Sequence, residues 1–233
     1  MRALLLSASR VGDTPYLVHA LPFIDALLKS TERELLFVPY AGVTISWDDY
    51  TGKVAEALAP LGITVTGIHS TDDPIKAVRQ AKAIAVGGGN TFRLVTELYG
   101  QQVLGAIKEQ VQGGTPYIGW SAGSNVAGKS VRTTNDMPIV YPPSFDGINL
   151  VPFQINPHFT DYVQPGHNGE TRSDRLNEFL TLNPQERVVC LPEGTALSLD
   201  GNKLTLLGDK GGYLMRFGNT QRIEEGCDLS HWL

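Results

Sequence analysis

The 233-residue sequence contains only two cysteines, Cys190 and Cys227, which lie far apart along the chain. So few cysteines exclude a disulfide framework and a metal site built from cysteines. The 19 basic and 24 acidic residues give a net charge of −5, and no cluster of Lys and Arg could follow a phosphate backbone. We therefore expect no nucleic-acid partner, and both thiols suit a reducing compartment.

The sequence also lacks any apolar run of transmembrane length. The apolar stretch at residues 3–6 is much shorter than the core of a signal peptide, and no linker, repeat or low-complexity segment divides the chain. Hydrophobic residues make up 42% of the sequence, enough for a substantial core. We therefore expect a cytoplasmic protein with no membrane association, folded as a single α/β domain over residues 1–233.

The order of apolar runs predicts the fold. In the first two thirds of the chain they alternate with amphipathic stretches, which is typical of parallel strands joined by crossover helices. From residue 195 onward, apolar and polar residues alternate around glycine turns, which favours antiparallel strands. We predict a three-layer α/β fold with a mostly parallel sheet flanked by helices and antiparallel strands at its C-terminal edge. Strands are expected at residues 2–7, 34–39, 63–68, 83–86, 116–119, 149–155, 187–191, 195–199, 203–207 and 213–217, and helices from Asp73-Pro74 onward, from Gln102 to Gly113 and over residues 171–182.

One serine stands between two glycines where a predicted strand runs into a helix, in Gly119-Trp120-Ser121-Ala122-Gly123. Small neighbours permit the strained turn of a nucleophile elbow, and the helix that follows directs its first N–H groups at the site. Ser121 is therefore our candidate nucleophile. The pattern alone also fits an ordinary turn in which this serine only caps the helix.

A serine nucleophile needs a histidine within hydrogen-bond reach. His158 follows a predicted strand, and sites in parallel α/β sheets gather at the carboxyl ends of strands, so this residue is the candidate base. An acid must then orient the imidazole. Asp136, in a polar loop, and Glu193, after a strand, are both candidates, and the residue pattern leaves both open. The other histidines are His19, His69, His167 and His231.

A second glycine cluster, Gly87-Gly88-Gly89, also joins a predicted strand to a helix. It lacks the Lys-Ser/Thr ending of a P-loop and the spaced glycines of a dinucleotide site. The N–H groups of Gly89 and Ala122 could instead form an oxyanion hole for a tetrahedral intermediate. A tight turn without a ligand is the other interpretation.

Seven motifs, in order along most of the chain, resemble those of the S51 serine peptidase family, which also contains cyanophycinases. They are PYAGVT at 39–44, VGGGNTF at 86–92, YIGWSAG at 117–123, RTTNDMP at 132–138, INPHF at 155–159, GETR at 169–172 and LPEG at 191–194. Seven ordered motifs are far more specific than one serine elbow.

The resemblance implies a fold similar to that of class I glutamine amidotransferases, which is flavodoxin-like, with Ser121 as nucleophile and His158 as base. Both Asp136 and Glu193 match positions proposed for the third role, and we favour Asp136. The implied activity is hydrolysis of dipeptides with a free N-terminal aspartate (Asp-X) through an acyl-enzyme, with no metal or other cofactor. The expected partner is a small peptide, and the protein is expected to be a monomer or a homodimer.

An Asp-X substrate presents a β-carboxylate and an ammonium group. Arg172 matches the family motif, and its planar guanidinium can hold a carboxylate in two places, so we expect it to bind the aspartate side chain. Glu170 is the candidate partner of the ammonium, and Asn90 is a further candidate for substrate binding. A surface charge pair at a helix start is the plainer interpretation of Glu170 and Arg172.

Two other functions fit the same residues. One is a different hydrolase on this scaffold, either a cyanophycinase-like enzyme or an esterase. The other is a non-catalytic protein whose Gly87-Gly88-Gly89 loop holds a nucleotide or small anion.

Overall fold

The computed structural model of the chain describes residues 1–163, 165–166 and 168–233, so His167 lies outside the described residues. Its large sheet has seven strands whose spatial order is β3 (Thr64–Gly67), β2 (Glu34–Val38), β4 (Ile84–Val86), β5 (Tyr117–Trp120), β1 (Arg2–Leu6), β8 (Ala196–Asp200) and β9 (Lys203–Leu207). The first five strands are parallel, and β8 and β9 run antiparallel at the edge. The predicted mostly parallel sheet with antiparallel strands on the C-terminal side is confirmed.

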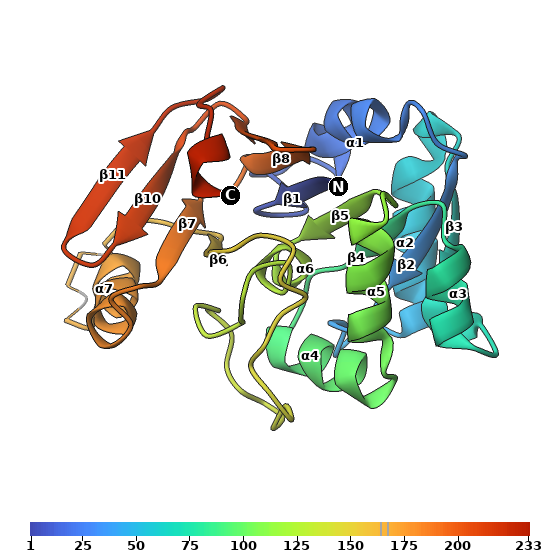
Figure 1. Cartoon of the computed structure of the whole chain (residues 1–233), viewed down its shortest axis with the longest axis horizontal. Helices are drawn as coiled ribbons and strands as arrows, with labels where there is room; N and C mark the ends of the chain where they lie inside the picture. The colour runs from blue at the N-terminus through green and yellow to red at the C-terminus, as the bar shows by residue number, and fades with distance from the viewer. Residues whose placement is uncertain (164, 167) are drawn as a thin grey trace.

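A second sheet of four strands lies beside the first (Figure 1). Its strands are β11 (Asn219–Ile223), β10 (Gly212–Arg216), β7 (Arg187–Leu191) and β6 (Gln154–Pro157), in that order. β6 and β7 are parallel, whereas β10 is antiparallel to both of its neighbours. The expectation that the strand at 213–217 joins the edge of the main sheet is therefore wrong, because it pairs with β7.

Helices cover both faces of the large sheet, which gives the predicted three layers (Figure 1). Alternate residues of a strand point to opposite faces: Leu4 packs in the cluster that contains Ile24 and Val54 of the helices on one side. Leu5 packs with Ile107 on the other. The first side has α1 (Leu21–Leu28) and α2 (Trp47–Leu58), and the second has α3 (Pro74–Gln80), α4 (Thr91–Gly100), α5 (Val103–Gln112) and α6 (Ala122–Asn125).

The other elements in the described ranges are α7 (Arg172–Leu182), which lies against the small sheet (Figure 1), and short 3-10 helices at Val18–Ala20, Ala59–Leu61, Ile68–Ser70 and Ser230–Trp232. Among the described residues, no helix combines the length and the apolar character needed to cross a membrane.

Local sequence explains several element boundaries. The Asp73 carboxylate accepts the backbone N–H of Lys76 at 2.9 Å, and Pro74 occupies the first helical position, so α3 begins where the sequence predicts. The strand expected at 149–155 is wrong over most of its length, because β6 begins only at Gln154. Asn149 has φ 58°, in the left-handed region, and the residues after it bond to the loop that follows α6.

One hydrophobic cluster joins the two sheets. Leu5 of the large sheet and Val189 of the small sheet belong to it, together with Phe153 from the segment that leads into β6. A shared core supports the single-domain organisation, which stays a proposal. It also fixes the relative position of β5 and β6, whose carboxyl ends carry Ser121 and His158.

Candidate active site

Ser121 occupies a sharp turn between β5 and α6. Its backbone has φ 54° and ψ −116°, an unusual conformation for a residue with a side chain, which costs about 1–3 kcal/mol. The turn is tight because Gly123 lies directly against the carbonyl of Val86, where a Cβ atom would collide. Strain of this kind at a strand-to-helix turn is the signature of a nucleophile elbow.

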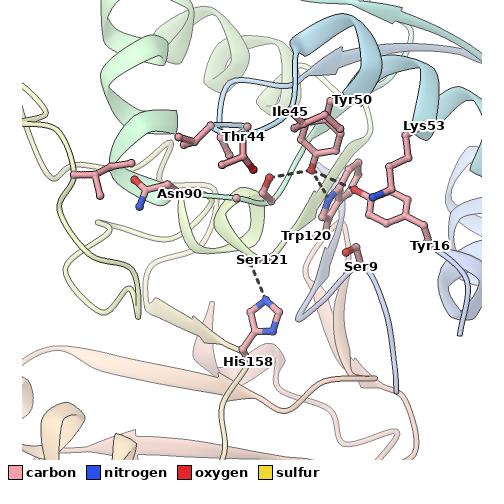
Figure 2. Close-up of a pocket in the computed structure, with 16 residues that line it drawn as sticks. Ser9, Tyr16, Thr44, Ile45, Tyr50, Lys53, Asn90, Trp120, Ser121 and His158 are labelled. Atoms are coloured by element: carbon pink, nitrogen blue, oxygen red, sulfur yellow. Dashed lines mark hydrogen bonds between the residues drawn. The ribbon is translucent and has the colours of Figure 1, made fainter. Parts of the chain in front are cut away.

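Two hydrogen bonds join Ser121, His158 and Glu193 in a chain (Figure 2 shows the first). The Oγ of Ser121 lies 2.8 Å from Nε2 of His158, and Nδ1 of the same ring lies 2.7 Å from Oε1 of Glu193. An ionised carboxylate can only accept a hydrogen bond, so its partner Nδ1 carries a proton. Nε2 is then free to accept the hydroxyl proton, as a general base requires.

The strand register brings the histidine and the glutamate together. β6 and β7 are parallel, with Pro157 paired to Leu191, so both strands end at the same edge. His158 comes one residue after β6 and Glu193 two residues after the end of β7. Their side chains keep 38% and 50% exposure, so solvent weakens the attraction between a charged imidazole and the carboxylate.

The backbone of His158 is itself held in place. It has φ 51°, in the left-handed region, and its N–H donates to the Oγ of Ser7 at 2.9 Å. Ser7 is fully buried at the end of β1 and donates in turn to the carbonyl of Leu191 at 2.7 Å. One hydroxyl therefore links the ends of β1, β6 and β7. Ser7 was not predicted from the sequence, since a serine at a strand end carries no distinctive signal.

Asp136, the favoured orienting acid, lies elsewhere. Its Oδ2 accepts the backbone N–H of Thr91 at 2.7 Å, at the first turn of α4. A carboxylate at this end of a helix is stabilised by the helix dipole and by the free N–H groups. The hydrogen-bond partner of His158 Nδ1 is thus Glu193, the alternative of the two acids, and the structure gives Asp136 a capping contact instead.

The glycine turn after β4 lies against the serine. A Cβ atom added to Gly88 would meet the Cβ of Ser121 at 2.8 Å. Gly89 has φ 136°, and the next residue, Asn90, donates its N–H to the carbonyl of Ala41 at 2.9 Å. Within the described residues, neither the N–H of Gly89 nor that of Ala122 donates to another backbone group. Both amides are therefore available to a developing oxyanion.

Asn90 has a structural role at the same turn. Its Oδ1 caps α4 by accepting the N–H of Arg93 at 3.0 Å, and its Nδ2 donates to the carbonyl of Met137 at 2.9 Å. These two bonds hold the loop after Asp136 against the site. Asn90 also lines the cavity at Ser121, so the structure places this candidate next to the serine (Figure 2).

A cavity of about 480 Å³ opens at Ser121. Its walls come from the loop after β2, from α2, from the glycine turn and from the elbow (Figure 2). Among the described residues that line it, none is Asp or Glu, and Lys53 and His158 are the two that can carry positive charge. The cavity thus suits an anionic ligand. Lys53 was not singled out from the sequence, because α2 itself was not predicted.

Arg172 and Glu170 lie outside this cavity. They line a neighbouring surface cavity together with Thr160. Nη1 of Arg172 donates to the backbone carbonyl of His158 at 3.3 Å, and partial burial lowers the pKa of its guanidinium from the ordinary value. The structure therefore places Arg172 directly behind the histidine peptide, and it leaves Glu170 exposed.

Apart from His158, the other histidines that the structure describes do not line the Ser121 cavity. His69 pairs with Asp48 at 2.9 Å, and both ring nitrogens of His19 are buried without a partner in the described part of the chain. Residues 1–163, 165–166 and 168–233 contain no group of three or more His, Cys, Asp or Glu placed to hold a metal ion.

Three features define the class of protein: an α/β fold, a strained serine elbow, and a serine, histidine and carboxylate joined by hydrogen bonds at strand ends. Together they are those of an α/β serine hydrolase. The chain belongs to peptidase family S51, whose model matches residues 3–207. The predicted membership is confirmed, and the protein is a serine peptidase.

Relatives support this assignment over the full length. Proteins named Peptidase E from Shewanella amazonensis and Shewanella denitrificans are 57% and 54% identical over 235 residues, and each match covers 100% of this chain and 99% of the relative. The crystal structure of a peptidase from an acI-B1 Actinobacterium is 18% identical, with a TM-score of 0.70 over 98% of this chain and 96% of that chain. That structure shares the fold.

Proposed function

We propose that this peptidase hydrolyses dipeptides with a free N-terminal aspartate through an acyl-enzyme at Ser121. The observation that carries the proposal is the hydrogen-bonded chain of Ser121, His158 and Glu193, with distances of 2.8 and 2.7 Å, at a cavity without acidic lining residues. The relatives named Peptidase E and the seven family motifs support the aspartyl specificity.

The chemistry proceeds in two stages. Ser121 Oγ attacks the aspartyl carbonyl while Nε2 of His158 takes its proton, and the carboxylate of Glu193 stabilises the resulting imidazolium. The N–H groups of Gly89 and Ala122 hold the oxyanion. His158 then protonates the departing amine. Water, activated by the same nitrogen, hydrolyses the acyl-enzyme and restores the serine.

Arg172 is proposed to bind the β-carboxylate of the aspartate. Its guanidinium is tied to the carbonyl of His158 by a long contact of 3.3 Å, which a charged ligand could replace with a shorter, bidentate bond. Binding requires the guanidinium to turn from its own cavity toward Ser121. Glu170, which lines the same neighbouring cavity, stays the proposed partner of the substrate ammonium, and Asn90 stays a proposed contact beside the serine.

A panel of peptides tests the proposed specificity. Asp-Leu should be hydrolysed, whereas Glu-Leu, Asn-Leu and N-acetyl-Asp-Leu should not, because each lacks the correct acid position, the acid charge or the free ammonium. Arg172→Met should lower kcat/KM for Asp-Leu by about 10- to 100-fold. Equal hydrolysis of Asp-Leu and Asn-Leu by the unmodified protein would contradict the aspartyl specificity. Turnover of β-aspartyl-arginine with none of Asp-Leu would favour the cyanophycinase-like alternative.

The proposal includes a cytoplasmic setting. Cys190 and Cys227 are both free, and burial raises the pKa of the Cys190 thiol well above its ordinary value. Such thiols suit a reducing compartment.

A further inference from the structure

The Ser121 cavity contains one permanent cation that the mechanism does not use. Lys53, on α2, is half-buried and extends its side chain into the cavity (Figure 2). No lining residue is acidic, and none of the ion pairs found in the described ranges includes Lys53. In a chain with a net charge of −5, an ammonium that lines the cavity of the nucleophile and has no ion-pair partner among the described residues is a specific feature that points to an anionic ligand group.

Tyr16, Tyr50 and Trp120 form an aromatic wall of the cavity, and the ammonium of Lys53 packs against it. Nζ of Lys53 lies 4.3 Å from the centroid of the Tyr16 ring, a cation–π contact. The Tyr16 hydroxyl donates to that of Tyr50 at 3.2 Å, which donates to the carbonyl of Gly88 at 2.9 Å. Trp120, next to the nucleophile, also donates its indole N–H to Tyr50 at 3.2 Å. The position of Lys53 is thus coupled to the glycine turn and to the elbow.

The wall is neutral, so it leaves the lysine charge uncompensated. Burial raises the pKa of both Tyr16 and Tyr50 from the ordinary value, and both phenols therefore keep their protons at neutral pH. An ammonium set against such poorly hydrated rings attracts a carboxylate more strongly than one in open water.

The arrangement of the cavity also indicates which end of a substrate Lys53 contacts. In Figure 2, Asn90 lies on one side of Ser121, and Lys53, Tyr16 and Ser9 lie on the other. Hydrogen bonds connect the Asn90 side to Arg172. Asn90 donates to the carbonyl of Met137 at 2.9 Å, Asn135 of the same loop donates to the carbonyl of Pro157 at 2.8 Å, and Arg172 donates to the next carbonyl, that of His158. Since Arg172 is the proposed partner of the aspartate side chain, the Asn90 side is taken as the aspartyl end, and the Lys53 side is then that of the leaving residue.

We propose that Lys53 binds the α-carboxylate of the residue that leaves, and so selects peptides that end one residue after the cleaved bond. The inference rests on the proposed function, since it assigns the second carboxylate of an Asp-X dipeptide. In a tripeptide a neutral carbonyl stands at this position, and the terminal carboxylate lies one residue farther away, about 3.8 Å along the chain. Lys53 is thus a specificity-determining residue for peptide length.

The test compares Asp-Leu with Asp-Leu-amide, which differ only in the charge of the terminal group. The unmodified protein should prefer the free acid in kcat/KM by about 10- to 100-fold, as expected for one charged hydrogen bond. Lys53→Met keeps the apolar stem against Tyr16 and should bring this ratio close to one. Lys53→Arg should restore most of it, because the guanidinium supplies the charge again.

A control variant and an unfolding measurement distinguish the loss of a specific contact from a general loss of structure. Lys76→Met removes an exposed lysine from α3 and should keep the ratio of the unmodified protein, and thermal unfolding of each variant reports its folded state. A ratio in Lys53→Met equal to that of the unmodified protein would overturn the inference, whether or not activity falls, because the lysine then does not contact the terminal carboxylate. Absence of any Asp-Leu hydrolysis by the unmodified protein would instead contradict the proposed function.

Discussion

The backbone N–H of His158 donates to the Oγ of Ser7 at 2.9 Å, across 151 positions of sequence. This bond fixes a histidine whose φ of 51° is unfavourable for a residue with a side chain. Because Ser7 also donates to the carbonyl of Leu191, the ends of β1, of the histidine strand β6 and of the glutamate strand β7 meet at one buried hydroxyl. We expect the position of His158 to depend on that junction.

Ser7→Ala should therefore impair catalysis through the position of His158. We expect kcat for Asp-Leu to fall about 10- to 100-fold, since small displacements of catalytic groups are costly. The free energy of unfolding should fall by about 1–2 kcal/mol, since the partly buried N–H of His158 loses its partner. Ser130→Ala is the matched control, because it removes another buried hydroxyl, which donates to Oε1 of Gln154 at 3.1 Å and is not among the hydrogen-bond partners of His158 in the described residues. Equal kcat values for the two variants would contradict a positioning role.

Glu193 and Asp136 should respond differently to neutral substitution. Glu193→Gln replaces the acceptor at His158 Nδ1 by a group that also donates, so we expect kcat to fall roughly 100-fold or more. Asp136→Asn retains an oxygen for the N–H of Thr91 and should mainly cost stability, about 0.3–1 kcal/mol, through the lost charge at the start of α4. Steady-state kinetics and denaturant unfolding check both. A larger kcat loss in Asp136→Asn would reverse the assignment.

Gly89 should tolerate no side chain. With φ 136° and the carbonyl of Ala41 in the way of a Cβ atom, Gly89→Ala must displace the proposed oxyanion donor. We expect kcat to fall about 100- to 1000-fold, with a loss of stability above about 1 kcal/mol. Gly52→Ala in α2, where a Cβ meets nothing within 4 Å, should instead stabilise the protein by about 0.5–1 kcal/mol. Kinetics at wild-type level in Gly89→Ala would exclude the oxyanion role.

Local sequence signals predicted much of the fold. β7 falls at Arg187–Leu191 as expected, and the Asp73-Pro74 start of α3 follows from one cap and one fixed φ angle. Local signals did not predict those parts of the fold that depend on pairing with segments distant in the sequence. The strand expected at 149–155 is mostly loop, because its apolar residues pack in the core without a neighbouring strand for their backbone. The separate sheet around β10 depends on pairing with β7, which periodicity cannot specify.

In the candidate site, too, some residues are predictable from local sequence signals, whereas others depend on contacts between remote residues. Ser121 and His158 carry local signals, a glycine-flanked turn and a strand end. The choice between Asp136 and Glu193 depends on the register of β6 against β7, which places Glu193 beside the imidazole. The position of Lys53 in the cavity follows only from the packing of α2 over that cavity. Each of these contacts is long-range, so no local motif encodes it.

Hydrolysis of Asp-Leu by Ser121→Ala decides whether Ser121 is the nucleophile. The variant removes only the Oγ atom that lies 2.8 Å from His158 Nε2, and its folded state can be checked by thermal unfolding. If Ser121 is the nucleophile, kcat should fall by at least about 10⁴-fold, because no acyl-enzyme can form. Turnover by a folded Ser121→Ala protein at the rate of the unmodified enzyme would contradict the account.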